Sequence, residues 1–203
     1  MAGAFLGTAK SEVPMRRLVT ARLDLIPVDD SNARALWRVL QQPNLREFQD
    51  IPRLSVEEFE RQVRTRPSRF APNVVGRFEW LIRERESNED IGWVSVRIND
   101  RTRDHAELGY SLITTARGKG YAREALRGLV DETFAATELA ELHACTVPEN
   151  LSSRHVLESL GFIETRLLHG GALVRNRRVD IILYIFTRAQ QLEALRAAQS
   201  QRG

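Results

Sequence analysis

Apolar side chains recur at two spacings along the chain, and each spacing predicts one kind of element. The helical spacing i, i+3, i+4, i+7 is clearest between Ala122 and Phe134, where it runs without a gap. Short apolar or alternating runs bounded by turn residues predict strands instead. The predicted helices lie between Ser31 and Pro43 and over residues 55–66, 122–134, 152–160 and 188–200. The predicted strands cover residues 18–26, 77–83, 91–98, 106–113, 142–147, 162–168 and 179–187.

Local signals at two helix ends support these assignments. Ser55 and Glu58 have the spacing of a capping box, in which the serine hydroxyl and the glutamate carboxylate satisfy backbone N–H groups at the helix start. Gly161 followed by Phe162 predicts a Schellman-type stop for the 152–160 helix, with Phe162 placed to contact Leu157.

The order of these elements predicts a single domain of the α/β (α+β) class. We expect a mixed, mostly antiparallel sheet with helices on both faces. Residues 1–15 are expected to form a flexible N-terminal tail, residues 16–187 the domain, and residues 188–203 a C-terminal helix and tail. A chain of 203 residues can bury a substantial core in one domain.

The positive charge of the chain is almost entirely arginine. Lys10 and Lys119 are its only lysines, the formal net charge is +3 and the sequence pI is near 9.5. Basic and acidic residues alternate through most of the chain, as they do over residues 57–64. This pattern predicts a mixed, solvated surface and makes a nucleic-acid partner unlikely.

Several absences narrow the class of protein further. Cys145 is the sole cysteine, so no internal disulfide can form, and we expect a small buried side chain in a cytoplasmic protein. The N-terminus lacks the pattern of a signal peptide, and the apolar run Ile181–Phe186 is far shorter than the roughly 20 residues that span a bilayer. We find no ligand spacing typical of a metal site.

Residues 117–122, Arg-Gly-Lys-Gly-Tyr-Ala, lie between a predicted strand and the clearest predicted helix. Glycines let a backbone approach an anion closely, and the first N–H groups of a helix point towards it. Arg117 and Lys119 add positive charge. A Gly-x-Gly turn before a helix is weak evidence for a phosphate site when it stands alone, because a plain strand–helix connection has the same pattern.

The flanking segments strengthen this interpretation. Residues 117–122 match the Arg/Gln-x-x-Gly-x-Gly/Ala pyrophosphate motif of the GNAT superfamily of N-acetyltransferases at every fixed position. Residues 106–112 resemble the preceding strand of its RimJ/RimL-like branch, which acetylates the N-termini of ribosomal proteins. Residues 148–162 resemble that branch's Pro-Glu-Asn-x-x-Ser…Leu-Gly-Phe segment. The resemblance extends over residues 19–187 and is strongest over 105–162.

The resemblance implies how the coenzyme is bound. The sheet would splay between strands 106–113 and 142–147, and the pantetheine arm of acetyl-coenzyme A would lie in the gap. Strand backbone groups would pair with the arm, the loop would hold the pyrophosphate, and a side chain from the far strand's end would anchor the arm. The implied residues are Leu112, Ile113, Thr114, Arg117, Gly118, Lys119, Gly120, Tyr121, Ala122, Asn150 and Ser153.

The resemblance also implies two catalytic residues. Ser153 would donate a proton to the departing thiolate, although a serine there could instead cap the helix. Glu107 would act as the base, through water. The alternative is that its carboxylate has a structural role or orients the substrate. Glu107 shares a strand face with Ser111, so if either reaches the cleft the other lies near it.

The chain departs from the family pattern in its acid–base groups. The position of the tyrosine that many members use as the acid is Leu157, and an acidic position of the branch is Gly170. His169 could replace the missing acidic group or be a surface residue. We expect no histidine on the face of the strand that carries Glu107. The site therefore lacks an obvious strong base. Because α-amines are far less basic than lysine side chains, such a site favours an α-amine acceptor.

The sequence therefore predicts an acetyl-coenzyme A-dependent N-acetyltransferase that acts on a primary amine, either a protein N-terminus or a small molecule. The alternative is a non-catalytic acyl-coenzyme A-binding regulatory protein of the same fold. The acceptor stays open, as does the oligomeric state, a homodimer included. We expect the loops 43–76 and 166–178 to face the acceptor. Their arginines hint at an acidic acceptor: Arg53, Arg64, Arg66, Arg69, Arg175, Arg177 and Arg178.

Overall fold

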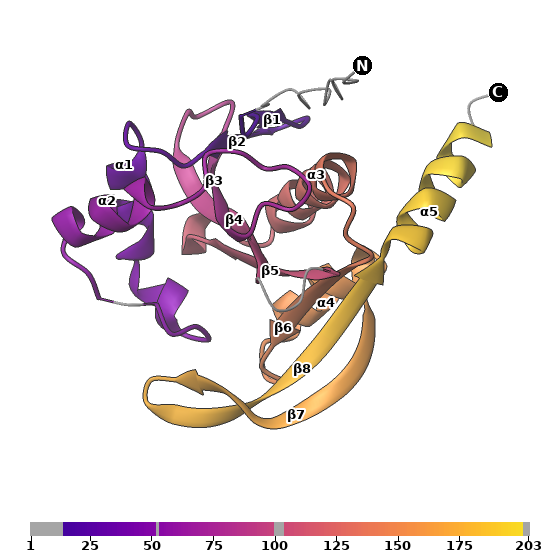
Figure 1. Ribbon diagram of the computed structural model, residues 1–203. Helices are drawn as coiled ribbons and strands as arrows, with labels where there is room; N and C mark the ends of the chain where they lie inside the picture. Colours follow the sequence, from indigo (N-terminus) through magenta and orange to yellow (C-terminus); the bar gives the residue numbers. More distant parts are fainter. Residues whose placement is uncertain (1–13, 52, 100–103, 201–203) are drawn as a thin grey trace, which may run out of the picture.

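The computed structural model describes residues 14–51, 53–99 and 104–200, which form one eight-stranded sheet with helices on both faces (Figure 1). Most of the expected tail, most of the expected turn at 99–104 and the last residues of the C-terminal tail lie outside the described residues. The strands, in sheet order, are β1 (Leu18–Val19), β2 (Leu23–Pro27), β3 (Gly76–Glu84), β4 (Asp90–Ile98), β5 (His105–Leu112), β6 (Glu141–Thr146), β8 (Arg177–Thr187) and β7 (Ile163–Val174). The helices are α1 (Ala33–Leu40), η1 (Pro43–Arg46), α2 (Val56–Arg64), η2 (Thr114–Ala116), α3 (Tyr121–Ala136), α4 (Leu151–Ser159) and α5 (Arg188–Ser200).

The sheet is antiparallel except between β5 and β6, and this parallel pair separates part-way along. Its register ends with Leu108 opposite Ala144. Strand β5 nevertheless continues its pairing with β4 as far as Leu112, and β6 continues its pairing with β8 as far as Thr146. The two strands therefore diverge beyond Leu108 and Ala144. The predicted mixed sheet and its splay are confirmed.

Each face of the sheet has its own hydrophobic core. Leu126 and Leu129 of α3 and Leu157 of α4 are fully buried against one face. Leu36 of α1 and Phe59 of α2 lie in a second cluster, on the other face. Alternate side chains of each central strand supply the two cores, as the period of two requires. The prediction of helices on both faces is confirmed.

Both predicted helix signals are present. The Ser55 hydroxyl accepts a hydrogen bond from the Glu58 N–H (3.2 Å), and the Glu58 carboxylate accepts one from the Ser55 N–H (2.8 Å). Phe162 N–H donates to the Leu157 carbonyl (3.1 Å), and Gly161, at φ +92°, donates to the Glu158 carbonyl (2.9 Å). Helix α4 therefore ends in the Schellman motif that the sequence predicts.

The first predicted strand, 18–26, is wrong as one element. It is a short hairpin in which Leu18 of β1 lies opposite Leu25 of β2. The turn is closed by Thr20, whose N–H donates to the Leu23 carbonyl (2.9 Å) while its hydroxyl accepts from the Leu23 N–H (3.1 Å). A threonine inside an apolar run predicts a strand, but here the Thr20 side chain stabilises a turn.

The predicted loop 166–178 is also wrong, because β7 and β8 form a long hairpin through it. Arg175 and Asn176, both at positive φ (50° and 59°), make the two-residue turn. Gly170, at φ +60°, lies where the register shifts between Leu168 and Ala172, so the glycines form a bulge within the strand. The tip reaches η1, where Arg175 Nε donates to the Arg46 carbonyl (3.3 Å).

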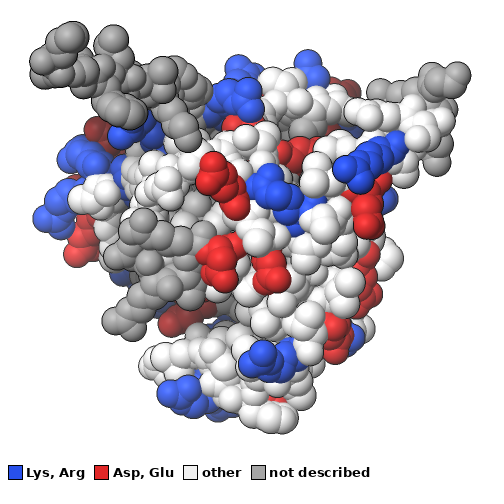
Figure 2. Space-filling view, turned by 45° about the vertical axis from the view of Figure 1, so that its right-hand side comes forward, with Lys and Arg blue, Asp and Glu red and all other residues white. Residues whose placement is uncertain are grey.

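The surface is mixed in charge, and α5 projects from the body of the domain (Figure 1). On the face drawn in Figure 2, basic and acidic side chains are interspersed over most of the surface. In the described part of the chain, no helix is both long and apolar enough to cross a bilayer.

Candidate active site

The Gly-x-Gly loop forms the start of α3 in a left-handed conformation. Gly118 has φ +74°, and Gly120, the N-cap of α3, has φ +80°. A Cβ on Gly118 would meet nothing within 4 Å, and a Cβ on Gly120 would meet only an Arg22 nitrogen, at 3.4 Å. The backbone is therefore open to an anion, and the unpaired N–H groups of a 16-residue helix begin there.

Basic side chains surround the same helix start. Arg22 Nη1 donates to the Lys119 carbonyl (2.9 Å), and Arg22 Nε binds the Glu124 carboxylate (2.7 Å), which ties the loop to the β1–β2 turn. A hollow of about 390 Å³ beside the loop is lined by Gly120, Glu124 and three arginines, Arg22, Arg123 and Arg127. Sequence reasoning missed Arg123 and Arg127, although their i, i+4 spacing on the helix was a readable signal.

Side-chain amides from the η1 region reach the free edge of β5. Gln49 Nε2 donates to the Tyr110 carbonyl (3.1 Å), and Asn44 Nδ2 donates to the Leu112 carbonyl (3.2 Å). Arg117 Nε also donates to the Leu112 carbonyl (3.3 Å), so this guanidinium lies against the strand end. Ile113 N–H bonds to the Ile91 carbonyl (2.9 Å). Of the residues expected to pair with a pantetheine arm, Leu112 presents its carbonyl to the gap.

Asn150 and Ser153 lie at the start of α4, on the β6 side of the gap. Asn150 is the N-cap, and its side chain accepts from the Ser153 N–H (3.1 Å). The Ser153 hydroxyl lies 2.8 Å from the Tyr110 hydroxyl of β5. Burial raises the pKa of Tyr110 to about 12. Leu157, at the position where many family members carry a tyrosine, is fully buried in the core.

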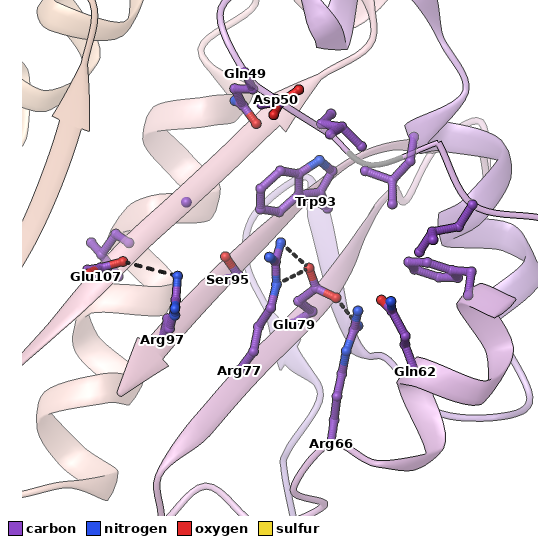
Figure 3. A pocket seen from close by; sticks show the side chains of 16 residues that line it. Gln49, Asp50, Gln62, Arg66, Arg77, Glu79, Trp93, Ser95, Arg97 and Glu107 are labelled. Atoms are coloured by element: carbon purple, nitrogen blue, oxygen red, sulfur yellow. Dashed lines mark hydrogen bonds and ion pairs between the residues drawn. The ribbon is translucent and has the colours of Figure 1, made fainter. Parts of the chain in front are cut away.

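Glu107 lies on the opposite face of β5, at a pocket of about 260 Å³ (Figure 3). Its carboxylate is about half exposed, with Arg97 Nη1 at 3.8 Å and Asn99 Nδ2 at 3.3 Å. Deeper in the pocket, the buried Glu79 carboxylate binds Arg66 and Arg77, the latter through Nη2 at 2.6 Å. Burial lowers the pKa of Arg66. Of the loop arginines expected to face an acidic acceptor, Arg66 lines this pocket. The Glu79 carboxylate already neutralises its charge.

Trp93 and Ser95 form the floor of this pocket. Both are 5% exposed, and Trp93 Nε1 is buried without a hydrogen-bond partner. They lie opposite Ser111 and Gly109 in the β4–β5 register. Gly109 has no room for a side chain, since a Cβ would lie 2.9 Å from the Ser95 hydroxyl. Nε1 itself exposes less than 1 Å², so a ligand satisfies this unpartnered donor only when the adjacent pocket wall moves.

The expectation that no histidine shares the face of Glu107 is wrong. His143 of β6 lies directly opposite Glu107 in the parallel register, and its Nε2 is 2.8 Å from Glu141 Oε2. His105 lies two residues before Glu107 on β5, and its ring stacks on His143 with the centroids 4.0 Å apart. The period of two between His105 and Glu107 could have been read from the sequence. The position of His143 beside Glu107 depends on the pairing of β5 with β6.

Cys145 is exposed, which corrects the expectation of a buried side chain. It follows His143 by two residues and so shares the face of His143 and Glu107. Partial burial and the Glu107 carboxylate raise the pKa of the Cys145 thiol. The group is therefore held as a neutral thiol, which is a poor nucleophile.

His169 lies away from these groups, on the β7–β8 hairpin. Its side chain is 80% exposed, and Nδ1 is 2.9 Å from the Asp180 carboxylate. The same carboxylate accepts from the Gly170 N–H (2.8 Å). His169 does not line the Glu107 pocket. The carboxylate beside Gly170 comes from the neighbouring strand.

Comparison with known proteins gives a consistent picture. Residues 22–163 match the family described as acetyltransferase (GNAT) domain. An uncharacterized N-acetyltransferase, p20 of Bacillus licheniformis, is 28% identical over 171 residues, which cover 84% of this chain and 95% of p20. The ribosomal-protein-S5-alanine acetyltransferase of Vibrio fischeri has a similar structure, with a TM-score of 0.73 at 19% identity, covering 85% of this chain and 97% of that one.

A structure with a different acceptor in its name is about as similar. The spermidine N-acetyltransferase chimera of Vibrio cholerae SpeG and hSSAT gives a TM-score of 0.72 at 20% identity, and the match covers 85% of this chain and 99% of that one. The likeness to these structures supports the fold and does not choose between acceptors.

Proposed function

The chain belongs to the GNAT family of acetyltransferases and is an N-acetyltransferase that uses acetyl-coenzyme A, and from this premise we propose how its residues divide the work. The observation that carries the proposal is the splay beyond Leu108 and Ala144. The glycine loop follows the end of β5 at this splay. Ser153 lies on one face of β5, and Glu107 with its pocket lies on the other face. The relatives named above are acetyltransferases and give no support to the alternative of a non-catalytic coenzyme-binding protein.

The coenzyme supplies an acetyl thioester and a pyrophosphate, and the residues around the splay suit both. Gly118 and Gly120 leave their backbone open, which supports close approach of phosphate. The N–H groups at the start of α3 and the guanidinium groups of Arg123 and Arg127 supply donors and positive charge. The remaining proposed contacts are Leu112, Ile113, Thr114, Arg117, Lys119, Tyr121, Ala122, Asn150 and Ser153.

Placement of an acid and a base on opposite sides of β5 supports direct attack on the thioester. Glu107 faces the acceptor pocket, where it can take a proton from the amine through water. Ser153 faces the gap from the other side, where it can give a proton to the sulfur. Cys145 is held as a thiol, which argues against an acetyl-cysteine intermediate. His143 lies beside Glu107 as a further group able to exchange a proton.

The acceptor pocket favours an amine that carries an oxygen atom near its nitrogen. Tryptophan is a donor only, and leaving a buried donor unpartnered costs about 1–3 kcal/mol. When acceptor binding shifts the pocket wall at Trp93, a peptide carbonyl can accept from Nε1, whereas a polyamine brings further donors. Glu79 and Glu107 already face guanidinium groups, so the pocket offers a polycation little free negative charge beyond Asp50. We therefore propose an α-amine of a peptide or an amino-acid derivative.

The basicity of the amine supports the same choice. An α-amine with a pKa near 8 is neutral in roughly a tenth of molecules at pH 7, whereas a lysine side chain is neutral in about one of 2,500. The test is release of coenzyme A thiol when acetyl-coenzyme A is mixed with peptides that have free N-termini. We expect release that depends on the peptide. Coenzyme binding without release for any amine would support the non-catalytic alternative.

A further inference from the structure

Tyr110 reaches Ser153 across the gap between the splayed strands. It lies on β5 beyond the last residue that pairs with β6, and its side chain points to the α3–α4 face. Its Oη lies 2.8 Å from Ser153 Oγ and 3.2 Å from the Ser153 carbonyl oxygen. Within the described part of the chain, these are the hydrogen bonds that the phenol makes.

We propose that Tyr110 is a positioning residue that orients the Ser153 hydroxyl for proton donation to the departing thiolate. The inference deepens the proposed function and rests on the role given there to Ser153. It also explains how a chain with Leu157 at the usual tyrosine position keeps a phenol at the site, because the phenol comes from β5 instead of α4.

The contacts on Ser153 assign different tasks to its two neighbours. Asn150 holds the backbone N–H of Ser153 (3.1 Å) and so fixes the start of the helix. It leaves the hydroxyl free to rotate. Tyr110 is the group that restrains this rotation, since it contacts Oγ directly. The Ser153 carbonyl can only accept, whereas Oγ can accept or donate, so the single phenol proton is available to either oxygen of Ser153. When the phenol donates to Oγ, the serine's own proton is free to point into the gap.

This arrangement suits a hydroxyl that must give up its proton. As negative charge grows on Ser153 Oγ, the phenol can turn its proton from the carbonyl to Oγ, which lies nearer. A hydrogen bond to a charged oxygen is stronger than one between neutral groups. Burial keeps the pKa of Tyr110 at about 12, so the phenol remains a donor throughout the pH range of an acetylation assay.

The proton and electron balance of the step is complete with these groups. The amine nitrogen bonds to the carbonyl carbon, the carbon–sulfur bond breaks, and sulfur leaves with the electron pair. Sulfur takes the Ser153 proton and becomes the thiol. The nitrogen loses its proton to Glu107 or to water, and Ser153 regains one from solvent. Tyr110 keeps its proton throughout, which distinguishes positioning from acid catalysis.

The test compares Tyr110→Phe, Ser153→Ala and the double variant in the full chain, with kcat, KM for acetyl-coenzyme A and coenzyme binding measured for each. Tyr184→Phe is the matched control. It removes a second buried phenol of the same core, whose bonds run to Glu158 (3.0 Å), Glu164 (3.2 Å) and Arg154 (3.2 Å) instead of to Ser153. Loss of a hydrogen bond to a developing charge predicts that Tyr110→Phe lowers kcat about tenfold or more, with KM for acetyl-coenzyme A nearly unchanged.

The double variant separates positioning from general structural damage. If Tyr110 acts through Ser153, adding Tyr110→Phe to Ser153→Ala lowers kcat by less than about twofold further. A kcat of Tyr110→Phe within about threefold of wild type, or equal effects of Tyr110→Phe with and without the serine, overturns the proposal. The proposal is also overturned if Ser153→Ala leaves kcat unchanged while Tyr110→Phe lowers it. Absence of acetyl transfer by the wild-type chain would instead refute the proposed function, so the two failures are distinguishable.

Discussion

Substituting Gly120 by aspartate should remove coenzyme binding while the domain stays folded. Gly120 has φ +80°, a conformation that costs a side-chain-bearing residue about 1–2 kcal/mol. Aspartate tolerates it better than most residues, and an Arg22 nitrogen lies 3.4 Å from the position of the new Cβ, ready to pair with the carboxylate. For a chain of this length, each kcal/mol shifts Tm by about 2–4 °C, so the free protein should melt about 2–8 °C lower.

The effect on binding should be much larger. At a concentration 100 times Kd, coenzyme A should stabilise the wild-type protein by about 2.7 kcal/mol and raise Tm by about 5–11 °C. A carboxylate about 4 Å from a phosphate charge opposes binding by roughly 4 kcal/mol at an effective dielectric constant near 20. That is about a thousandfold in Kd, so the same ligand concentration would stabilise Gly120→Asp by less than about 0.1 kcal/mol.

Gly170→Asp is the matched control for this experiment. Gly170 also has positive φ (60°), and its Cβ would likewise lie near an arginine, with Arg178 Cδ at 3.6 Å. It lies on the β7–β8 hairpin, outside the loop. Because the new carboxylate would lie beside Asp180, which accepts from the Gly170 N–H, we expect a loss of Tm at least as large as for Gly120→Asp and an unchanged thermal shift with coenzyme A. A folded Gly120→Asp that kept the coenzyme-induced shift would refute the assignment of this loop to phosphate.

Two further substitutions test the chemistry on either side of β5. Ser153→Ala should lower kcat about 10²–10⁴-fold with little change in coenzyme affinity, because it removes the proposed proton donor to sulfur. Asn150 is the N-cap of α4, so a loss below about threefold in steady-state assays would leave the Ser153 hydroxyl without a role in catalysis. Trp93→Phe removes the unpartnered N–H and keeps an aromatic ring, so it should lower kcat/KM for a peptide amine about two- to tenfold, the equivalent of 0.5–1.5 kcal/mol. The same variant assayed with spermidine should be unaffected, and an equal loss with both acceptors would show that Trp93 Nε1 does not contact the acceptor.

The elements that the sequence predicts well are those whose signals are local. The capping box at Ser55, the stop at Gly161 and the unbroken apolar stripe of α3 all depend on residues within a few positions of each other. The two errors involve side chains that override a local pattern. Thr20 closes a turn inside an apolar run, and the glycines at 170–171 form a bulge where they would usually end a strand.

The site shows a sharper division between what is local and what is not. The glycine loop, Ser153 and Glu107 lie in contiguous motifs, so a single sequence suffices to propose them. Tyr110, Trp93 and His143 gain their meaning from pairing across strands. The period of two along a strand predicts that Tyr110 and Glu107 lie on opposite faces of β5. The contact of Tyr110 with Ser153 depends on where α4 packs relative to the splay. The position of His143 beside Glu107 depends on the register of β5 with β6.

The most direct measurement uses two peptides of one sequence with the wild-type chain and acetyl-coenzyme A. One peptide has a free N-terminus and no lysine, and the other has a blocked N-terminus and a single lysine. Released thiol and acetylated peptide are quantified together across about pH 7 to 9, the range in which α-amines become neutral. We expect equal amounts of thiol and N-terminally acetylated peptide, formed faster than any acetyl-lysine. Faster acetylation of the blocked lysine peptide would contradict the α-amine assignment, and no transfer to either peptide or to small amines, with coenzyme binding intact, would contradict the assignment as an N-acetyltransferase.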